Sequence, residues 1–312
     1  MSNLLGYLVF KRLRVEGANS ISSPLTYGFP AISAFLGATH QLSRKLSISE
    51  DYSELSLGGV LICAHECDPQ VYRTSRYADY SFNLSRNPIL RSGKTASISE
   101  EGKAHLLVTL AVEVYSSEYT ELEDSDIDPN SLSQQLFEWI QQQPLAGGRV
   151  RQLSKFDPVK FYETSQIHEI HRALMPGFVL MDAAQDLAEI TAELKTTNPE
   201  ACELDALIEV STLHHEPDTS KAETRWSTRS AKSDRGWLVP IPVGYQGISD
   251  LFEPGSMQHS RNPEYPAQFV ECLYSLGKWQ FPSRLEDLSC AFWRYEYQAE
   301  QSLFLTTQNQ PK

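Results

Sequence analysis

A corner between a predicted strand and a predicted helix constrains the fold of this chain more than any other feature. Residues 19–30 read Asn-Ser-Ile-Ser-Ser-Pro-Leu-Thr-Tyr-Gly-Phe-Pro, and apolar residues then recur at helical spacing through residues 31–46. This spacing predicts an amphipathic helix with Pro30 at its first position, where the N–H that proline lacks would have no partner. The mixed apolar and charged residues 8–16 predict a strand ahead of the corner.

The corner is a candidate anion site. The start of a helix directs unpaired N–H groups and the positive end of the helix dipole outward, an arrangement that favours phosphate. The hydroxyl and aromatic residues gathered there can hold a polar ligand. The alternative is a plain connection in which the serines only cap the helix.

The rest of the first half predicts three strands and a second helix. Residues 57–67 form a compact apolar run, and apolar residues alternate through residues 106–114, which predicts a strand with one buried face. Asp128 and Pro129 predict the cap and first position of a helix, and residues 145–150 lead into a short strand. The order β-α-β-β-α-β is that of ferredoxin-like and RNA-recognition folds, so we expect an α+β protein.

A long insertion interrupts this order. Residues 68–103 separate the second and third strands, which a short hairpin usually joins, and they show no clear helical pattern. We expect a projecting β-hairpin, or thumb.

The sequence predicts three parts. Residues 1–153 form an RNA-recognition-like palm that carries the thumb at 68–103, residues 154–235 form a helical insertion with a mobile polar loop, and residues 236–312 form a C-terminal segment packed on the palm. In the second half, the patterns predict helices after Asp182, at 204–213 and at 266–276, a polar loop at 216–234, and an extended segment at 236–245.

Charge is segregated along the chain. The net charge of −13 by itself argues against a nucleic-acid partner. However, five basic residues against one acid lie between Arg73 and Lys94, with aromatic residues among them, and a second basic run occupies residues 221–235. Residues 113–128 hold seven acids and no Lys or Arg. This pattern predicts an acidic body with a basic arm, or arginines that pair with the body's own acids.

The five cysteines are unevenly spaced, so we expect reduced thiols in a cytoplasmic protein without a signal peptide or membrane span. Cys63, His65 and Cys67 would share one face of a strand, but zinc needs a second ligand pair, which the neighbouring sequence lacks. We therefore expect a packed cysteine, and neither a metal nor another cofactor.

Several long motifs resemble those of one family, in the same order. They are Asn19-Ser-Ile-Ser-Ser-Pro-Leu-Thr-Tyr-Gly-Phe-Pro30, Phe82-Asn-Leu-Ser-Arg-Asn-Pro88, Glu100-Glu-Gly-Lys-Ala-His-Leu106, Leu145-Ala-Gly-Gly148, Leu174-Met-Pro-Gly-Phe178 and Gly236-Trp-Leu-Val-Pro-Ile-Pro-Val-Gly-Tyr245. The family is the smaller tail subunit of the type I-F CRISPR surveillance (Csy) complex, a protein of the RAMP superfamily.

The resemblance implies a function. Members bind the five-prime handle of CRISPR RNA together with the large tail subunit, and they cap a backbone of repeated subunits as part of antiviral defence. The adjacent backbone subunit is therefore a second expected partner, and a contact with target duplex DNA beside the protospacer-adjacent motif stays open. The family is not held to contain the processing nuclease, so we expect no enzyme. The acidic surface, which includes Glu121, Glu123, Asp124 and Asp126, is expected to meet a basic partner subunit.

Single-stranded RNA needs cations for its phosphates and planar groups on which bases stack. The predicted RNA-binding residues lie in the corner, the thumb and the Gly-Gly segment. They are Asn19, Ser20, Ser22, Ser23, Tyr27, Phe29, Asn83, Ser85, Arg86, Asn87, Arg91, Lys94, Gly147, Gly148, Arg149 and Arg151. The Gly-Gly pair can let the backbone approach a ligand, or it can end a helix.

His40 supports the alternative function, a metal-independent RAMP endoribonuclease. It lies on the flank of the first predicted helix, where it could act as a general base on a 2′-hydroxyl. Because no spacing identifies a second acid or base, we expect a packed or hydrogen-bonded histidine and no catalysis.

Overall fold

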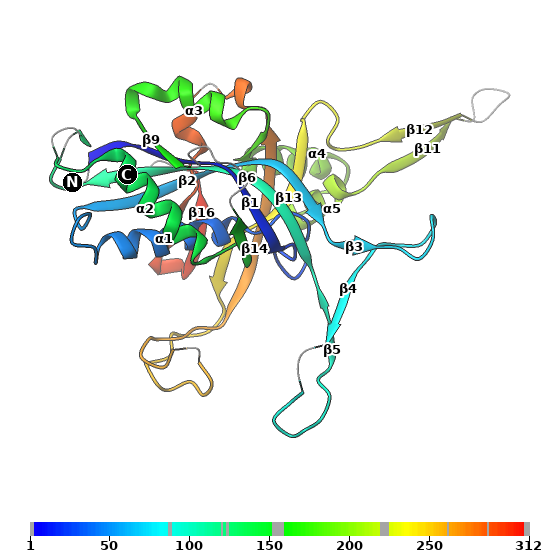
Figure 1. Cartoon of the computed structure of the whole chain (residues 1–312). Coiled ribbons are helices and arrows are strands. Elements are labelled where there is room, and N and C mark those ends of the chain that lie inside the picture. The colour runs from blue at the N-terminus through cyan, green and yellow to red at the C-terminus, as the bar shows by residue number, and fades with distance from the viewer. Residues whose placement is uncertain are drawn as a thin grey trace. The chain divides into compact units, whose positions relative to one another are not determined.

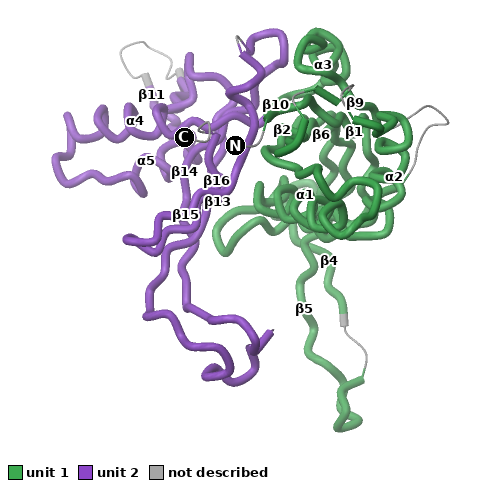
Figure 2. The backbone as a smooth tube through the Cα atoms, turned by 90° about the vertical axis from the view of Figure 1, so that its left-hand side faces the viewer, with its two compact units in different colours: residues 1–179 green, residues 180–312 purple. Residues whose placement is uncertain are grey.

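The computed structural model describes residues 3–86, 89–119, 121–122, 125–151, 159–218, 225–260, 262–285 and 287–308. It contains both helices and strands (Figure 1), so the predicted α+β class is confirmed. The chain divides into two compact units, residues 1–179 and 180–312 (Figure 2). The three-part division stays a prediction. Within the described ranges, every helix is too short or too polar to cross a membrane.

Unit 1 is built on an antiparallel sheet in the strand order β2-β6-β1-β8. Its strands and helices follow the predicted β-α-β-β-α-β order. They are β1 (Asn3–Asn19), α1 (Ile32–Leu46), β2 (Leu55–Pro69), β6 (Lys103–Ser116), α2 (Pro129–Gln141), β7 (Pro144–Leu145) and β8 (Gly148–Arg151). β9 (Val159–Glu163) also pairs with β1, and a 3-10 turn (Thr164–Gln166), α3 (Ile167–Leu174) and the start of β10 (Phe178–Asp182) complete the unit.

The two helix starts differ from one another. α2 begins as predicted, because Pro129 is its first residue and Asp128 accepts two backbone hydrogen bonds as its cap. In α1 the first helical residue is Ile32, so the prediction for Pro30 is wrong by two positions. Ala31 is the N-cap residue and no side chain caps this helix, so the alternative that the serines cap it is wrong as well.

The prediction of one buried face for the third palm strand is wrong. From Val108 to Val114 every residue of β6 is buried. α3 packs against β1 and β6 and lies on the opposite side of the sheet from α1 and α2 (Figure 1). Both faces of β6 are therefore covered, and Thr109 and Glu113 are buried among its apolar residues.

A β-bulge separates the side chains of the Cys63-Ala-His-Glu-Cys67 motif. The register shift between Ala64 and Glu66 adds one residue to β2 relative to β6. Cys63 is therefore buried against the Leu174 carbonyl oxygen, 3.3 Å from its sulfur, whereas Cys67 is exposed. The prediction that the three side chains share a face is wrong, because one extra residue reverses the face of every later side chain.

His65 connects the Met175–Phe178 turn to the sheet by hydrogen bonds. Its Nδ1 bonds to the Pro176 carbonyl oxygen, so this nitrogen carries the proton. Its Nε2 lies 2.7 Å from the Thr109 hydroxyl, which accepts the Arg12 N–H at 3.0 Å and can donate its own proton to the neutral imidazole. Burial, with a smaller contribution from Arg12, lowers the pKa of His65, although the bond to the carbonyl raises it.

Lowered pH will weaken this contact. The folded pKa of His65 is below its ordinary value of 6.5, so below that pH the unfolded chain binds a proton that the folded chain does not. The free energy of unfolding should therefore fall as the pH drops through this window. Urea unfolding at about pH 7.5 and about pH 5.5 should show a smaller pH effect in His65→Gln than in the wild-type protein. An equal pH effect in both proteins would contradict this assignment.

Unit 2 packs two helices on antiparallel strands in the order β15-β16-β13-β14. Its elements are α4 (Ala184–Thr197), α5 (Glu203–Ser211), β11 (His214–Asp218), β12 (Arg225–Arg229), β13 (Trp237–Gly247), β14 (Val270–Gln280), β15 (Arg294–Gln298) and β16 (Leu303–Thr307), with 3-10 turns at Pro282–Arg284, Leu288–Ala291 and Ala299–Gln301. α4 packs on β14 and α5 on β13. Leu187, Val210, Leu238 and Leu276 form much of the core between them.

Two predictions for unit 2 are wrong. The predicted helix at 266–276 overlaps β14, which pairs with β13 along its whole length, from Trp237 opposite Trp279 to Gly247 opposite Val270. The predicted polar loop at 216–234 contains most of a hairpin, because β11 and β12 pair with each other. The predicted helices near 182 and 204 and the extended segment at 236–245 are present as α4, α5 and β13.

Candidate nucleic-acid interface

The corner at 19–30 is a compact loop held by its own hydroxyl groups. The hydroxyls of Ser22 and Ser23 each lie 2.7 Å from the Thr26 hydroxyl, and Ser23 also accepts the backbone N–H groups of Leu25 and Thr26. Ser20 is fully buried. Ser22 and Ser23 therefore shape the loop, whereas the Ser20 hydroxyl is buried without a hydrogen-bond partner among the described residues and presents no side-chain surface to a ligand.

The corner contacts the base of the thumb. The Ser20 N–H donates to the Gly102 carbonyl oxygen at 2.9 Å, and the Cys67 thiol lies 3.6 Å from the Gly28 carbonyl oxygen. The exposed ring of Tyr27 meets Phe82 edge-on, with 5.4 Å between ring centres. Phe29 instead stacks on Phe35 of α1. Two motifs far apart in the sequence thus form one surface, with Tyr27 at its exposed side.

The Leu145–Gly148 segment also lies beside the corner. The Asn19 N–H donates to the Ala146 carbonyl oxygen at 2.8 Å. Ala146 and Gly147 have positive φ angles of 50° and 79°, as a two-residue hairpin turn between β7 and β8 requires. The helix-end alternative is therefore wrong. Gly148 allows close approach to β1, because an added Cβ atom would lie 2.7 Å from the Ala18 nitrogen.

The thumb projects as predicted. β3 (Val71–Tyr72), β4 (Ser81–Arg86) and β5 (Ile98–Glu101) form a small antiparallel sheet, and β4 and β5 extend away from the body of unit 1 (Figure 2). Asn83 on β4 is exposed, and Ser85 is half-buried. The backbone of Arg86 lies in β4, whereas Asn87 lies outside the described residues.

The described thumb cations have no acidic partner. Arg73 lies over the Tyr80 ring, 4.8 Å from its centre, and donates to the Arg76 carbonyl oxygen at 3.2 Å. Arg91 and Lys94 are exposed near the tip. In the part of the thumb that the structure describes, none of these four cations forms an ion pair. Their charge is therefore available to an anionic ligand.

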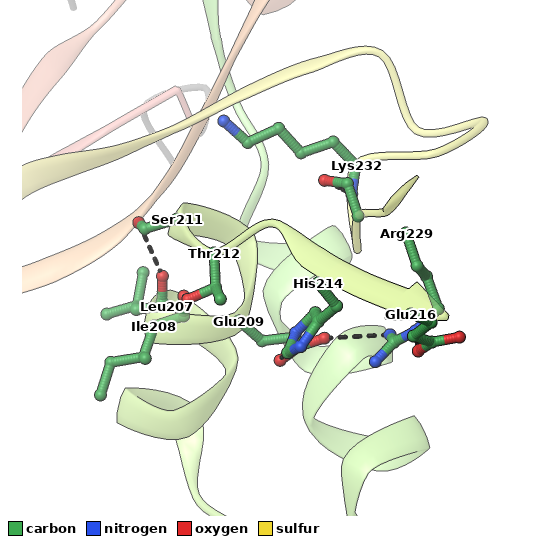
Figure 3. A network of polar contacts seen from close by, with 10 residues as sticks. Leu207, Ile208, Glu209, Ser211, Thr212, His214, Glu216, Arg229 and Lys232 are labelled. Atoms are coloured by element: carbon green, nitrogen blue, oxygen red, sulfur yellow. Dashed lines mark hydrogen bonds and ion pairs between the residues drawn. The ribbon is translucent and has the colours of Figure 1, made fainter. Parts of the chain in front are cut away.

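Two arginines of the second basic run, residues 221–235, form ion pairs with acids, unlike the described thumb cations. Arg229 of β12 donates to Glu209 at 3.1 Å and to Glu216 at 3.2 Å, and His214 also meets Glu209, at 2.9 Å (Figure 3). These hydrogen bonds raise the pKa of Arg229. Arg235 pairs with Glu193. For these two arginines, the alternative of pairing with the body's own acids is confirmed. Lys221 lies outside the described residues.

Two arginines share the Glu16 carboxylate where β1 pairs with β8, and a third arginine lies opposite Glu16 in the register. Arg151 pairs with Glu16 at 2.6 Å, Arg14 lies 3.9 Å from the same carboxylate, and Arg149 stands opposite Glu16 in the β1-β8 register. Arg149 and Arg151 are exposed, as an RNA-binding role requires. Arg14 could not be recognised from the sequence, because only the pairing of β1 with β8 places it beside the other two arginines.

The acidic run is partly structural. Glu113 is buried and accepts the Gly59 N–H at 2.9 Å and the Tyr115 hydroxyl at 3.1 Å. Asp128 caps α2, and its hydrogen bonds from Ser131 and Asn130 lower its pKa. Glu121 and Asp126 are exposed. Glu123 and Asp124 lie outside the described residues, so two of the four acids predicted to meet a partner are placed.

His40 is exposed on α1, without a hydrogen bond or ion pair to another described residue, so the expectation of a packed or bonded histidine is wrong. Across the described ranges, no three His, Cys, Asp or Glu side chains converge as a metal site would require.

Comparison with known proteins identifies the family. A family model described as CRISPR-associated protein (Cas_Csy2) matches residues 8–306. A relative from Pseudomonas aeruginosa (strain UCBPP-PA14), the CRISPR-associated protein Csy2, is 34% identical over 313 residues, which cover 95% of this chain and 93% of the relative. The match spans both compact units, the corner and the thumb. The chain therefore belongs to the Csy2 family of CRISPR-associated proteins.

Proposed function

We propose that this protein is a non-catalytic RNA-binding subunit of the type I-F CRISPR (Csy) surveillance complex. In this role it binds the five-prime handle of CRISPR RNA together with the large tail subunit, caps the backbone of repeated subunits and serves antiviral defence in the cytoplasm. One observation carries the proposal: the described thumb cations lack acidic partners and lie on the same projection as Phe82, which meets the exposed Tyr27 ring of the corner.

The topology of unit 1 supports this proposal. Antiparallel strands in the order β2-β6-β1-β8, with α1 and α2 on one side, correspond to a ferredoxin-like or RNA-recognition-like palm. The thumb is inserted between β2 and β6, where the sequence predicted it. We therefore assign unit 1 as a RAMP palm that positions the thumb beside the corner.

The candidate residues divide into two groups. Direct contacts are assigned to side chains that are exposed, whereas Ser20, Ser22, Ser23 and Phe29 support the corner from within. The exposed group consists of Asn19, Tyr27, Asn83, Arg91, Lys94, Arg149 and Arg151. Its cations suit phosphates, and Tyr27 offers a ring on which a base can stack.

We propose binding without cleavage. His40, the only candidate general base that the sequence suggested, is exposed and has no hydrogen-bonded acid among the described residues to hold its tautomer. Metal-free cleavage of repeat RNA by the purified protein, abolished in His40→Ala, would establish the endoribonuclease alternative instead.

The proposed partners are the large tail subunit and the adjacent backbone subunit. The exposed acids Glu121 and Asp126 suit a basic subunit surface, and the unpaired thumb cations also allow a contact with target duplex DNA. All five cysteines are without a disulfide partner, as a reducing compartment favours. Binding of handle RNA, compared with scrambled RNA, by the reconstituted tail heterodimer tests the proposal.

A further inference from the structure

An uncharged row of aromatic rings crosses three strands of the sheet in unit 2. Tyr245 of β13 stands opposite Phe304 of β16, and Phe304 stands opposite Tyr297 of β15. Directly opposed residues of an antiparallel pair point to the same face. The rings of Tyr297 and Phe304 are stacked, with 4.6 Å between centres. Tyr295, two residues before Tyr297, extends the row. We call these four residues the aromatic face.

The aromatic face is open to solvent. Between 39% and 58% of each of its four side chains is exposed. α4 packs on β14 and α5 on β13, whereas the main neighbours of β15 and β16 are each other and β13. Large rings in a contiguous exposed row are unusual for a surface that meets only water. Tyrosine and phenylalanine are also the residue types enriched at the centres of protein interfaces.

The loop that follows β13 also exposes large apolar side chains. The chain between β13 and β14, residues 248–269, exposes further large apolar side chains, and Phe252 packs edge-on against Phe269 with 5.9 Å between ring centres. The exposed apolar residues of this loop are Ile248, Leu251, Phe252, Tyr265 and Phe269. By sequence this loop holds three acids, Asp250, Glu253 and Glu264, against one arginine, Arg261, which lies outside the described residues.

The charge of this loop indicates which kind of partner the surface can bind. The loop has a net negative charge, with three acids against Arg261, so it repels the phosphates of a nucleic acid, and two copies related by a twofold axis would bring the same acids together. A protein surface rich in Lys and Arg fits both properties, because the acids attract its charges and the rings contact its aliphatic stems and cationic groups.

We infer that the aromatic face and the loop at 248–269 bind a neighbouring Csy protein through a basic contact surface. This inference rests on the proposed function, because it takes the partner from the same complex. It assigns unit 2 to protein assembly and leaves the thumb and the corner of unit 1 to RNA.

Co-expression of the full chain with the other Csy proteins, followed by affinity purification and titration of the purified partners, tests the inference. Tyr297→Ala should weaken assembly by at least about tenfold, as loss of a central interface ring commonly does. Trp226→Ala is the matched control, since this ring is 66% exposed on β12, outside the aromatic face. The control should change assembly less than about twofold. Thermal unfolding should show that both variants are folded.

A pair of charged variants tests the sign of the charge on the partner's contact surface. Tyr245→Lys with Tyr297→Lys and Tyr245→Glu with Tyr297→Glu both remove two rings, but the lysines should weaken assembly about tenfold more than the glutamates because they repel a basic partner. Equal assembly of Tyr297→Ala and wild type, or a stronger effect of the glutamates, would overturn the inference. So would loss of self-association of the isolated chain on Tyr297→Ala, which would make a second copy the occupant.

RNA binding separates this inference from the proposed function. Aromatic-face variants are measured for assembly without RNA, and thumb variants for RNA binding within the assembled complex. Loss of assembly in the first set with no RNA effect in the second would uphold the aromatic face and reject the RNA role of the thumb. The reverse result would reject the aromatic face alone.

Discussion

Removing Arg91 and Lys94 together by alanine substitution should lower the affinity for handle RNA by about 25-fold at ~0.1 M salt. Both cations are exposed near the thumb tip, and neither pairs with an acid of the described chain. If each neutralises one phosphate of single-stranded RNA, the slope of log affinity against log salt should become shallower by about 1.4, and the affinity should fall accordingly. A salt series of filter-binding measurements on the reconstituted tail heterodimer gives both values.

The matched control removes the same charge from paired arginines. Arg229 and Arg235 are held by Glu209, Glu216 and Glu193. Replacing both with alanine changes the net charge as much as the thumb variant does, yet the affinity should fall less than about threefold. An equal fall in both double variants would mean that overall charge, and not the thumb, determines RNA binding.

Placing a methyl group on Gly148 should destabilise unit 1 by about 1–3 kcal/mol, the usual cost of overpacking. The added Cβ would lie 2.7 Å from the Ala18 nitrogen and the Glu16 carbonyl oxygen and 2.8 Å from Val15 Cγ1. Because β1 cannot move away without losing its pairing with β6, β8 should separate from it. Denaturant unfolding of Gly148→Ala measures the loss.

Gly147→Asn is the control for this substitution. Gly147 has a φ of +79°, which asparagine tolerates, and its added Cβ would meet Asn19 only at an ordinary 3.5 Å. Its free energy of unfolding should change by less than about 1 kcal/mol. If Gly148→Ala is no less stable than Gly147→Asn, then β8 does not approach β1 as closely as the structure shows.

The parts of the fold that local signals determine could be predicted from sequence. The apolar spacing after residue 30 predicts α1, and the Asp128-Pro129 pair predicts the start of α2 through hydrogen bonds within one turn. Both helices are present. The insertion at 68–103 can be recognised as a projecting hairpin because it breaks a regular strand order. In these cases the residues that decide the structure are close to one another in the chain.

The errors arise where distant residues decide the structure. Residues 266–276 carry apolar side chains at spacings that a helix also allows, but pairing with β13 makes most of them a strand. One bulged residue at His65 separates Cys63 from Cys67. Whether the arginines of a basic run form ion pairs depends on whether an acid such as Glu209 lies within reach in the folded chain. The order of charges along the sequence does not show this. The corner serines likewise bond to Thr26 of their own loop, which residue type alone does not indicate.

The most direct test of the central claim compares handle RNA with scrambled RNA of the same length, bound by the reconstituted tail heterodimer across a salt series. If the thumb and the corner hold the handle in a fixed shape, both RNAs should lose affinity with salt. The handle should still bind at least about tenfold more tightly at every salt concentration, because contacts to bases depend less on salt than contacts to phosphates do. Equal affinity of the two RNAs at all salt concentrations, or no binding of either, would contradict the account.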